Sequence, residues 1–433
     1  MYTEKSTLDE STKAEDSSKP VPKPKLWTRN FVLLWQGQFV SDLGDNLYSI
    51  ALSFWVLAKT NSTALMGAIM AVFMLPMIVL SPFAGVLVDR ISRKRILILM
   101  DILRGGLMVL LSIRAFSGFI DIWMLFIAAF ILGTCAAFFT PAVNAVLPEI
   151  VEKDDLIRAN SAFGFVRSGS DMIGSSLSGF VYKILGAPFI FLANGISFLI
   201  SGATIFAMKS KKAEKVQAKT NVISDFKEGI KFLWGFRGLK YFVIISAIIN
   251  FFSSMAIVLL LPLFERTEGL GPEKYGISMA LFTFGMLVGM MGTYSLKITA
   301  NKKFAVFMST LIISCVCFTL FSVMKVFPVM CVLLFLEGIC MSVSGVFLNA
   351  SVQLIVDKDM LGKVFGIMSS LLQGFTPIAM VIGGILAEFI PLRNIIFTIS
   401  ILIFAVSILF FFIPSFRKFI NYDPKTQTPQ QIM

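Results

Sequence analysis

The sequence predicts an all-α integral membrane protein, with twelve transmembrane helices in two six-helix, pseudo-symmetric bundles. Hydrophobic residues fill 56% of the 433 positions, only 15% are charged, and the mean hydropathy is +0.83. A soluble protein of this length has no core that could bury so much apolar surface. The apolar runs are also too long and too unbroken for the strands of a membrane barrel, and the two halves of the chain resemble each other.

Twelve apolar runs reach the roughly 20 residues that a helix needs to cross a bilayer. We expect spans at 31–58, 64–88, 96–116, 122–148, 157–184, 188–208, 240–264, 275–296, 304–325, 328–355, 362–388 and 392–414. The predicted domains are a disordered cytoplasmic tail (1–28), a first bundle (29–208), a linker with an amphipathic helix (209–239), a second bundle (240–415) and a C-terminal cytoplasmic tail (416–433).

The net charge of +12 comes from short basic clusters between apolar runs, which argues against a nucleic-acid partner. Alternate loops hold Arg90, Arg93, Lys94 and Arg95; Lys209, Lys211, Lys212, Lys215 and Lys219; Lys297, Lys302 and Lys303; and Arg417 and Lys418. The opposite loops are poorer in lysine and arginine, and "ERTEGLGPEKYG" (265–276) is net acidic. By the positive-inside rule, we expect a multi-pass protein of the cytoplasmic membrane with both termini in the cytoplasm.

The linker between the two halves changes character along its length. It begins lysine-rich and continues as "SDFKEGIKFLWGF" (224–236), in which Phe226, Ile230 and Leu233 recur at helical spacing. Ser224 is suited to cap the start of a helix. We therefore expect a short amphipathic helix that lies on the inner face of the membrane.

The second half of the chain repeats the first. "NASVQLIVDKDML" (349–361) aligns without a gap with "NAVLPEIVEKDDL" (144–156), and the match includes asparagine, lysine and aspartate in a polar loop. Spans four and five therefore correspond to spans ten and eleven. Two similar halves in the same orientation are typical of transporters built from parallel repeats.

The loop "GVLVDRISRKR" (85–95) between spans two and three resembles the loop signature of the major facilitator superfamily. Ser92 stands where that signature has a second glycine. Four further stretches, "SDLGDNLYSIAL", "FFTPAVNAVLPEIV", "DDLIRANSAFG" and "LGKVFGIMSSLLQGFTPIAMVIGGILAE", resemble one branch of the superfamily. This branch, the drug:proton antiporters, includes the macrolide efflux proteins and the enterobactin exporter. The resemblance covers about residues 30–410 and implies the major facilitator fold.

The resemblance also implies a conformational latch that holds the outward-open state. Its residues are Gly85, Asp89, Arg90, Arg93 and Lys94. Asp89 would face the N-terminus of span eleven, where a carboxylate gains about 0.3–2 kcal/mol from the helix dipole and free N–H groups. The alternative is that the basic residues only set topology. The corresponding loop "GTYSLKITANKK" (292–303) has no acid, so any latch is one-sided.

Several ionisable side chains lie inside the predicted spans, where each costs about 2.5–3.5 kcal/mol on insertion scales. One face of span one carries Gln38, Ser41, Asp42, Asp45, Asn46, Ser49 and Ser53; span three carries Asp101 and Arg104; span five carries Arg167 and Asp171; and span ten carries Glu337. Pairing, protonation or a wet cavity must offset this cost. Arg167–Asp171 and Asp101–Arg104 have an alternative interpretation as structural pairs, and Asp45 has one as a helix-packing hydrogen bond.

Four carboxyl groups are candidates for proton coupling: Glu337, Asp45, Asp42 and Asp171. Glu337 has no basic residue within a helical turn, and apolar surroundings favour the neutral form of a carboxyl group. A group of this kind can bind and release a proton as its access to water changes. The resemblance implies that spans one, four, seven and ten line the central cavity, which includes the spans of Asp42, Asp45 and Glu337.

The candidate substrate-cavity residues are Asn46, Phe54, Phe138, Asn144, Asn250, Phe251, Phe347 and Asn349. Packing against lipid or core is the alternative for each phenylalanine. With 44 phenylalanines, 23 methionines and few acids, the chain suits bulky amphiphilic substrates, cationic ones among them. We expect a proton-coupled exporter of hydrophobic or amphiphilic small molecules, such as macrolide-like drugs, that works by alternating access. The alternatives are an exporter of an endogenous siderophore or lysolipid, an uncoupled facilitative importer, and a membrane receptor or scaffold.

The sequence argues against enzymatic chemistry and against bound cofactors. It has no histidine, which removes histidine-based zinc sites and Ser-His-Asp triads, and it has no GxxxxGK[ST] phosphate loop. Its five cysteines lie within or beside apolar runs and are best interpreted as packing residues. We therefore expect no metal and no cofactor. The expected partners are a small amphiphilic substrate, protons and the lipid bilayer, and the expected state is a monomer.

Overall fold

The computed structural model describes residues 26–152, 155–209, 222–295, 299–356 and 358–422. The N-terminal half comprises α1 (Arg29–Thr60), α2 (Thr63–Arg90), α3 (Arg93–Phe116), α4 (Ile122–Ile150) and α5 (Leu156–Phe206). α5 runs through both the fifth and the sixth predicted spans. Gly186, at φ 73° and ψ 168°, interrupts its helical backbone, and Pro188 follows. A positive φ costs glycine little, so the chain turns there into a second arm.

The C-terminal half is preceded by α6 (Val222–Gly235), which packs against α11 and α7 of that half. The half consists of α7 (Arg237–Arg266), α8 (Pro272–Ser295), η2 (Ala300–Lys302), α9 (Lys303–Val323), α10 (Phe327–Ile355), α11 (Lys358–Gln373), α12 (Thr376–Phe389), α13 (Leu392–Ile408), η3 (Leu409–Phe412) and α14 (Pro414–Ile420). The predicted span 362–388 is thus divided into α11 and α12. Pro377 is the second residue of α12 and lies in its first turn, where its missing N–H costs no helical hydrogen bond.

Residues 416–420 differ from the expectation that they belong to a tail. They form most of α14, which packs against α7, and Phe416, Phe419 and Ile420 are fully buried. Burial removes these three large apolar side chains from water, and this stabilises the short helix in its packed position. Of the predicted tails, residues 1–25 and 423–433 lie outside the described residues.

The predicted fold class is confirmed. Within the described ranges, the helices include ten that are long and apolar enough to cross a membrane, and α5 counts once among them although it fills two predicted spans. α1 is not one of the ten, and it is the helix that carries Gln38, Asp42 and Asp45. The described residues form no β-strand.

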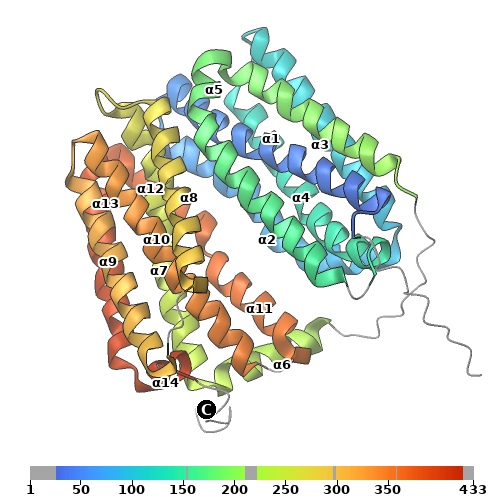
Figure 1. Cartoon of the computed structure of the whole chain (residues 1–433). Coiled ribbons are helices and arrows are strands. Elements are labelled where there is room, and N and C mark those ends of the chain that lie inside the picture. Colours follow the sequence, from blue (N-terminus) through green and yellow to red (C-terminus); the bar gives the residue numbers. More distant parts are fainter. Residues whose placement is uncertain (1–25, 153–154, 210–221, 296–298, 357, 423–433) are drawn as a thin grey trace, which may run out of the picture.

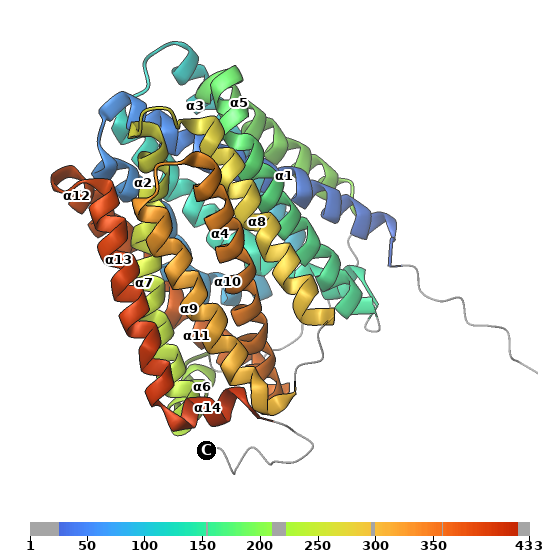
Figure 2. The same cartoon turned by 60° about the vertical axis from the view of Figure 1, so that its left-hand side comes forward.

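The two halves meet at one end and spread apart toward the other (Figure 1). We call the end that holds α6 and α14 the linker end and the opposite end, with Asn61 and Glu388, the distal end. Figure 2, turned by 60°, again shows α6 and α14 at the bottom of the C-terminal half. The repeat is visible in the packing: Gly133 of α4 lies against the Phe73 carbonyl of α2, and Gly338 of α10 lies against the Phe282 carbonyl of α8. A Cβ at either glycine would collide with that carbonyl.

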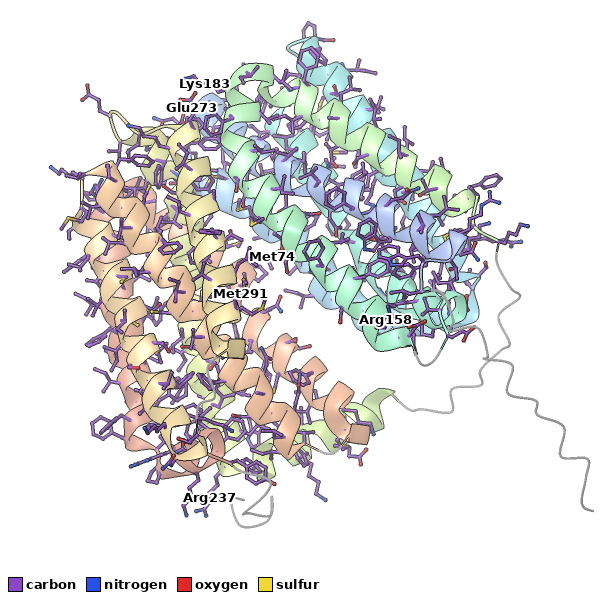
Figure 3. The ribbon with its side chains drawn as sticks, viewed as in Figure 1. Met74, Arg158, Lys183, Arg237, Glu273 and Met291 are labelled. Atoms are coloured by element: carbon purple, nitrogen blue, oxygen red, sulfur yellow. The ribbon has the colours of Figure 1, made fainter. Side chains whose placement is uncertain are left out.

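Polar contacts join the two halves at the distal end. Glu388 of α12 accepts hydrogen bonds from Ser62 Oγ (2.8 Å), Thr63 Oγ1 (3.1 Å) and the Ala64 N–H (3.0 Å) at the start of α2. An ion pair of 2.9 Å joins Lys183 of α5 to Glu273 of α8, and both are labelled together in Figure 3. One buried apolar cluster also spans both halves, from Leu57 of α1 to Leu260 of α7. Together these contacts seal the distal end.

At the linker end, by contrast, the buried clusters among the described residues stay within one half. One includes Phe242, Phe307 and Phe416, all from the C-terminal half. Another includes Leu34 and Leu97, from the N-terminal half. The structure is therefore closed between its halves at the distal end and divided at the linker end.

Candidate functional site

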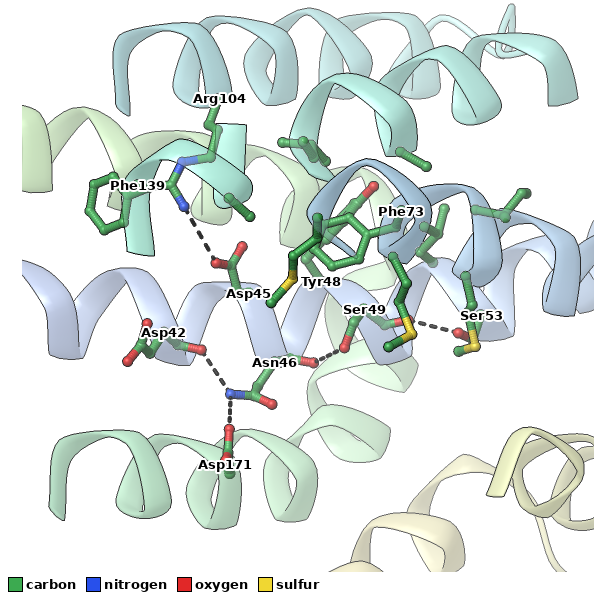
Figure 4. Close-up of a pocket in the computed structure, with 18 of the residues that line it drawn as sticks. Asp42, Asp45, Asn46, Tyr48, Ser49, Ser53, Phe73, Arg104, Phe139 and Asp171 are labelled. Carbon is green, nitrogen blue, oxygen red and sulfur yellow. Dashed lines mark hydrogen bonds and ion pairs between the residues drawn. The ribbon is translucent and has the colours of Figure 1, made fainter. Parts of the chain in front are cut away.

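A cavity of about 490 Å³ lies within the N-terminal half, bounded by α1 to α5 and touched by Met380 of α12. Figure 4 shows its polar wall, which α1 supplies together with parts of α3 and α5. The lining residues are Gln38, Asp42, Asp45, Asn46, Tyr48, Ser49, Leu52, Ser53, Val56, Met66, Ile69, Met70, Phe73, Met74, Met77, Arg104, Ala129, Leu132, Ala136, Phe139, Thr140, Arg167, Asp171, Phe198 and Met380.

The polar wall follows one face of α1, because residues three and four apart in a helix share a face. Gln38 Nε2 donates to Asp42 Oδ1 at 2.5 Å. Asn46 Nδ2 donates both to the Asp42 carbonyl at 2.9 Å and to Asp171 Oδ1 of α5 at 2.8 Å (Figure 4). These bonds hold Asp42 and Asp171 on the same wall.

Asp45 is a partly exposed carboxylate of the cavity wall. Its side chain is 45% exposed, and Asn194 Nδ2 of α5 donates to its Oδ1 at 3.3 Å. The other oxygen, Oδ2, lies 3.9 Å from Arg104 NH1 of α3, at the outer limit of an ion pair (Figure 4). Gly44 beside it has no side chain, so α1 can approach Asn194 and Ser197 closely. Asp45 is thus held in place but only loosely neutralised.

Arg104 is fixed far more firmly than Asp45. Its NH2 forms a close ion pair with Asp101 Oδ1, one turn earlier on α3, and Asp101 is fully buried. The guanidinium carbon lies 4.1 Å from the centre of the Phe139 ring and 4.2 Å from that of Phe198. A cation between two aromatic faces is attracted by both ring quadrupoles. The Asp101–Arg104 pair therefore exists as expected, and Arg104 also lines the cavity.

The facing wall is apolar and rich in methionine. Met66, Met70, Met74 and Met77 of α2 line the cavity at intervals of three or four residues. Met380 of α12, whose carbonyl lies against Gly67 of α2, adds a methionine from the other half. Methionine is unbranched and polarisable, so it adapts to ligands of different shape. The cavity therefore combines an acidic wall with a deformable apolar wall.

Glu337 lies elsewhere. It belongs to α10 in the C-terminal half and is absent from the cavity lining. It is close enough to Cys315 and Cys317 of α9 and to Cys340 of α10 to act on them electrostatically. Among the described residues, no hydrogen bond or ion pair satisfies its carboxyl group.

Of the eight predicted substrate-cavity residues, only Asn46 lines this cavity. Phe54 is fully buried against Tyr182 and Tyr275, with ring centres 5.3 and 5.7 Å away. Asn250 instead accepts a hydrogen bond from Thr376, and Asn349 donates to the carbonyl of Gly345 in its own helix. Also outside the lining are Phe138, Asn144, Phe251 and Phe347.

The predicted Arg167–Asp171 pair is not formed in the described part of the chain. Asp171 is bonded to Asn46 of α1, and both Arg167 and Asp171 face the cavity. Four-residue spacing allows such a pair along a helix but does not require it. The link between α1 and α5 takes its place.

The latch stays a prediction. Gly85 has open space around it, while the side chains of Asp89 and Arg90 lie outside the described set. Arg93 pairs with Glu149 of α4 at 2.7 Å, and Lys94 donates to the carbonyls of Phe206 and Met208. Both basic residues thus bond within the N-terminal half, at the end where the halves are apart.

Sequence reasoning missed three features of the cavity. Arg104 was assigned a structural role only, because Asp101 explains it locally. Phe139, which covers Arg104, is not among the predicted substrate-cavity residues. The methionine row on α2 has a readable signal, since Met66, Met70, Met74 and Met77 recur at helical spacing within an otherwise uninterrupted apolar run.

Comparison with known proteins decides the family. The sequence profile of the Major Facilitator Superfamily matches residues 34–373 and 301–430. The chain belongs to this superfamily of membrane transporters. It is 27% identical over 376 residues to macrolide efflux protein A of Streptococcus pyogenes, covering 85% of this chain and 92% of that protein. It is 24% identical over 356 residues to the multidrug efflux pump Tap of Mycobacterium tuberculosis, covering 80% and 84%.

Solved structures agree on the fold. A bacterial homologue of the human lysosomal transporter Spinster, in an inward-facing and unoccupied conformation, has a TM-score of 0.65 at 12% identity, with 91% of this chain and 98% of that chain covered. A point mutant of the nucleoside transporter NupG has a TM-score of 0.66 at 12% identity, with 88% and 98% covered. At such identities the likeness concerns the fold alone. Together with the family match, the membrane-spanning helices make the chain a multi-pass membrane transporter.

Proposed function

We propose that this transporter exports amphiphilic small molecules, cationic ones among them, and that an inward flow of protons drives the export. The observation that carries the proposal is a cavity with three carboxylates, Asp42, Asp45 and Asp171, opposite a row of methionines. The efflux functions in the names of its relatives support the same direction of transport. Macrolide-like drugs, which join a large apolar surface to an amine, have this chemistry.

The charges of the cavity favour a cation. Arg104 and Arg167 are its basic lining residues, and Arg104 already pairs with Asp101 behind the wall. The acidic wall therefore retains excess negative charge, which attracts a cation strongly where water is scarce. The methionine wall accepts the apolar body of the same molecule.

The different packing at the two ends of the interface between the halves supports alternating access. The present structure is sealed at the distal end and divided at the linker end, and the opposite arrangement would require the contacts of Glu388 and of Lys183–Glu273 to break. The latch at Asp89 would then form at the linker end. A transporter of this kind exposes one cavity to each side in turn.

Orientation and domain limits complete the proposal. Basic loops at the linker end support a cytoplasmic location for that end and for both termini. The proposed domains remain 1–28, 29–208, 209–239, 240–415 and 416–433, with residues 416–420 of α14 counted as a folded part of the last segment. In a background without native cysteines, Leu270→Cys should react with an impermeant maleimide from outside, and Lys215→Cys should not. The reverse labelling would contradict the orientation.

The direct test of export uses everted membrane vesicles and tetraphenylphosphonium, a lipophilic cation. A proton gradient, acid inside, should drive its accumulation, and an uncoupler should release what has accumulated. Accumulation that ignores the uncoupler, or uptake that only follows the cation gradient, would contradict proton coupling and favour a facilitative transporter. Vesicles without the protein provide the baseline, because the cation itself responds to membrane potential.

A further inference from the structure

Three neighbouring charged side chains lead from the protein interior to the cavity, and their exposure increases along the way. Asp101 is fully buried, Arg104 lies beside it between two aromatic rings, and Asp45 opens to the cavity. Arg104 binds Asp101 closely through NH2 and reaches Asp45 only at 3.9 Å through NH1. The guanidinium of Arg104 thus contacts two carboxylates, one closely and one weakly.

We propose that Asp101 is a charge-compensating residue that determines whether the cavity accepts cations. By neutralising Arg104, it leaves the negative charge of Asp45 available to a ligand. The proposal rests on the proposed function, since it assumes a cationic substrate at Asp45, and it assigns that specificity to a residue that the substrate does not touch.

The geometry prevents Arg104 from escaping if Asp101 loses its charge. Phe139 of α4 and Phe198 of α5 hold the guanidinium from both faces, and the Asn194 bond keeps Asp45 close by. An uncompensated Arg104 would therefore pair fully with Asp45. Removing one partner of a buried ion pair leaves the other charge uncompensated, which costs free energy unless that charge finds a new partner. The cavity would then repel cations while keeping its shape.

Arg104 also has the planar group that this arrangement needs. Its fork of N–H donors can bind two carboxylates at once, which the single ammonium of lysine does with less directionality. The two aromatic faces favour a flat guanidinium in the same way.

The test compares Asp101→Asn, Arg104→Gln and the double variant. Asp101→Asn keeps the size of the side chain, and it should weaken tetraphenylphosphonium binding by at least about tenfold, or about 1.4 kcal/mol. The double variant restores the charge balance and should bind within a few-fold of wild type. Arg104→Gln alone should bind the cation at least as tightly as wild type. Binding of N-phenyl-1-naphthylamine, a neutral amphiphile, should stay constant throughout.

A matched control comes from the same half of the molecule. Asp155 and Arg158 form another pair three residues apart, at 2.8 Å and outside the cavity lining. Asp155→Asn should leave the binding of both probes unchanged. A loss of cation binding in Asp101→Asn that the double variant fails to restore would make Asp101 merely structural and overturn the proposal.

A second measurement needs no substrate. Dicyclohexylcarbodiimide labels protonated carboxyl groups in apolar sites, and mass spectrometry locates the label. Labelling of Asp45 should fall in Asp101→Asn, because Arg104 then holds it ionised, and it should recover in the double variant. If wild type binds no tetraphenylphosphonium, the proposed substrate class fails, and the labelling pattern alone decides the role of Asp101. Unchanged labelling in Asp101→Asn would overturn that role.

Discussion

The two halves share one fold but differ in chemistry. In the N-terminal half, α1, α3 and α5 carry Asp45, Arg104 and Asp171 around a cavity. In the C-terminal half, the comparable interior cluster is neutral: Asn250 of α7 accepts from Thr376 of α12, and Ser254 lies 3.3 Å from the same Thr376 hydroxyl. Glu337, on α10 of that half, does not belong to this cluster, and its neighbours include the thiols of Cys315 and Cys340.

This difference indicates a division of labour. A repeated architecture supplies the two bodies that move, while substitutions within one copy create a charged binding site. The neutral cluster holds α7 to α12 through hydroxyl and amide groups that do not titrate. We infer that the N-terminal half recognises substrate and that Glu337 responds to protons without contacting it.

The largest expected effect comes from Asp45→Asn. The neutral side chain mimics the protonated state, so uphill export of tetraphenylphosphonium should be abolished and its binding weakened by about tenfold or more. Downhill exchange of a neutral amphiphile should survive. Transport in vesicles and binding to purified protein measure the two effects. Asp121→Asn, at the start of α4 and outside the cavity, is the control. Normal uphill export by Asp45→Asn would break the assignment of the site.

Glu337→Gln should separate coupling from binding. Because Glu337 lies outside the cavity lining, tetraphenylphosphonium binding should stay within about twofold of wild type, below about 0.5 kcal/mol. Uphill export should be lost while downhill exchange continues. The same two assays measure this, with Cys340→Ser, which alters a neighbouring thiol, as the control. Weakened binding in Glu337→Gln would contradict the division between the halves.

Asp89→Asn tests a difference between the loops of the two halves, which lies far from the cavity and has the smallest expected effect. The loop of Asp89 has an acid, whereas "GTYSLKITANKK" in the other half has none. Removing the charge costs a helix-terminus interaction of about 0.3–2 kcal/mol, so turnover should slow by about two- to thirtyfold with binding intact. Initial export rates and equilibrium binding measure these. Lys302→Gln, in the acid-free loop, should leave turnover unchanged. Full turnover in Asp89→Asn would reduce the loop to a topology signal.

Periodicity predicted a polar face of α1, because residues three and four apart must share a side of a helix, and every member of that face except Ser41 lines the cavity. It could not predict which side meets the cavity, since this depends on how each helix is rotated in its bundle. Phe54 lies nine residues beyond Asp45, which at about 3.6 residues per turn is half a turn around α1. It therefore faces Tyr182 and Tyr275 instead of the cavity.

Arg104 shows a different limit of sequence reasoning. A local partner, Asp101, accounts for its charge, so nothing along α3 indicates the second contact with Asp45. That contact arises only when α1 and α3 both pack on α5, which the lack of a side chain at Gly44 and Gly105 allows. The pattern within each helix is enough to predict the fold. The binding site depends on contacts between helices that are distant in the sequence.

The most direct test of the central claim is the number of protons released when substrate binds. If a lipophilic cation and protons compete for the carboxylates of the N-terminal cavity, titration of purified protein with tetraphenylphosphonium must release protons. Calorimetry in buffers of different ionisation enthalpy measures that number. We predict net release by wild type and by Glu337→Gln, and none by Asp42→Asn/Asp45→Asn. Binding without release in wild type, or unchanged release in the double variant, would contradict the claim.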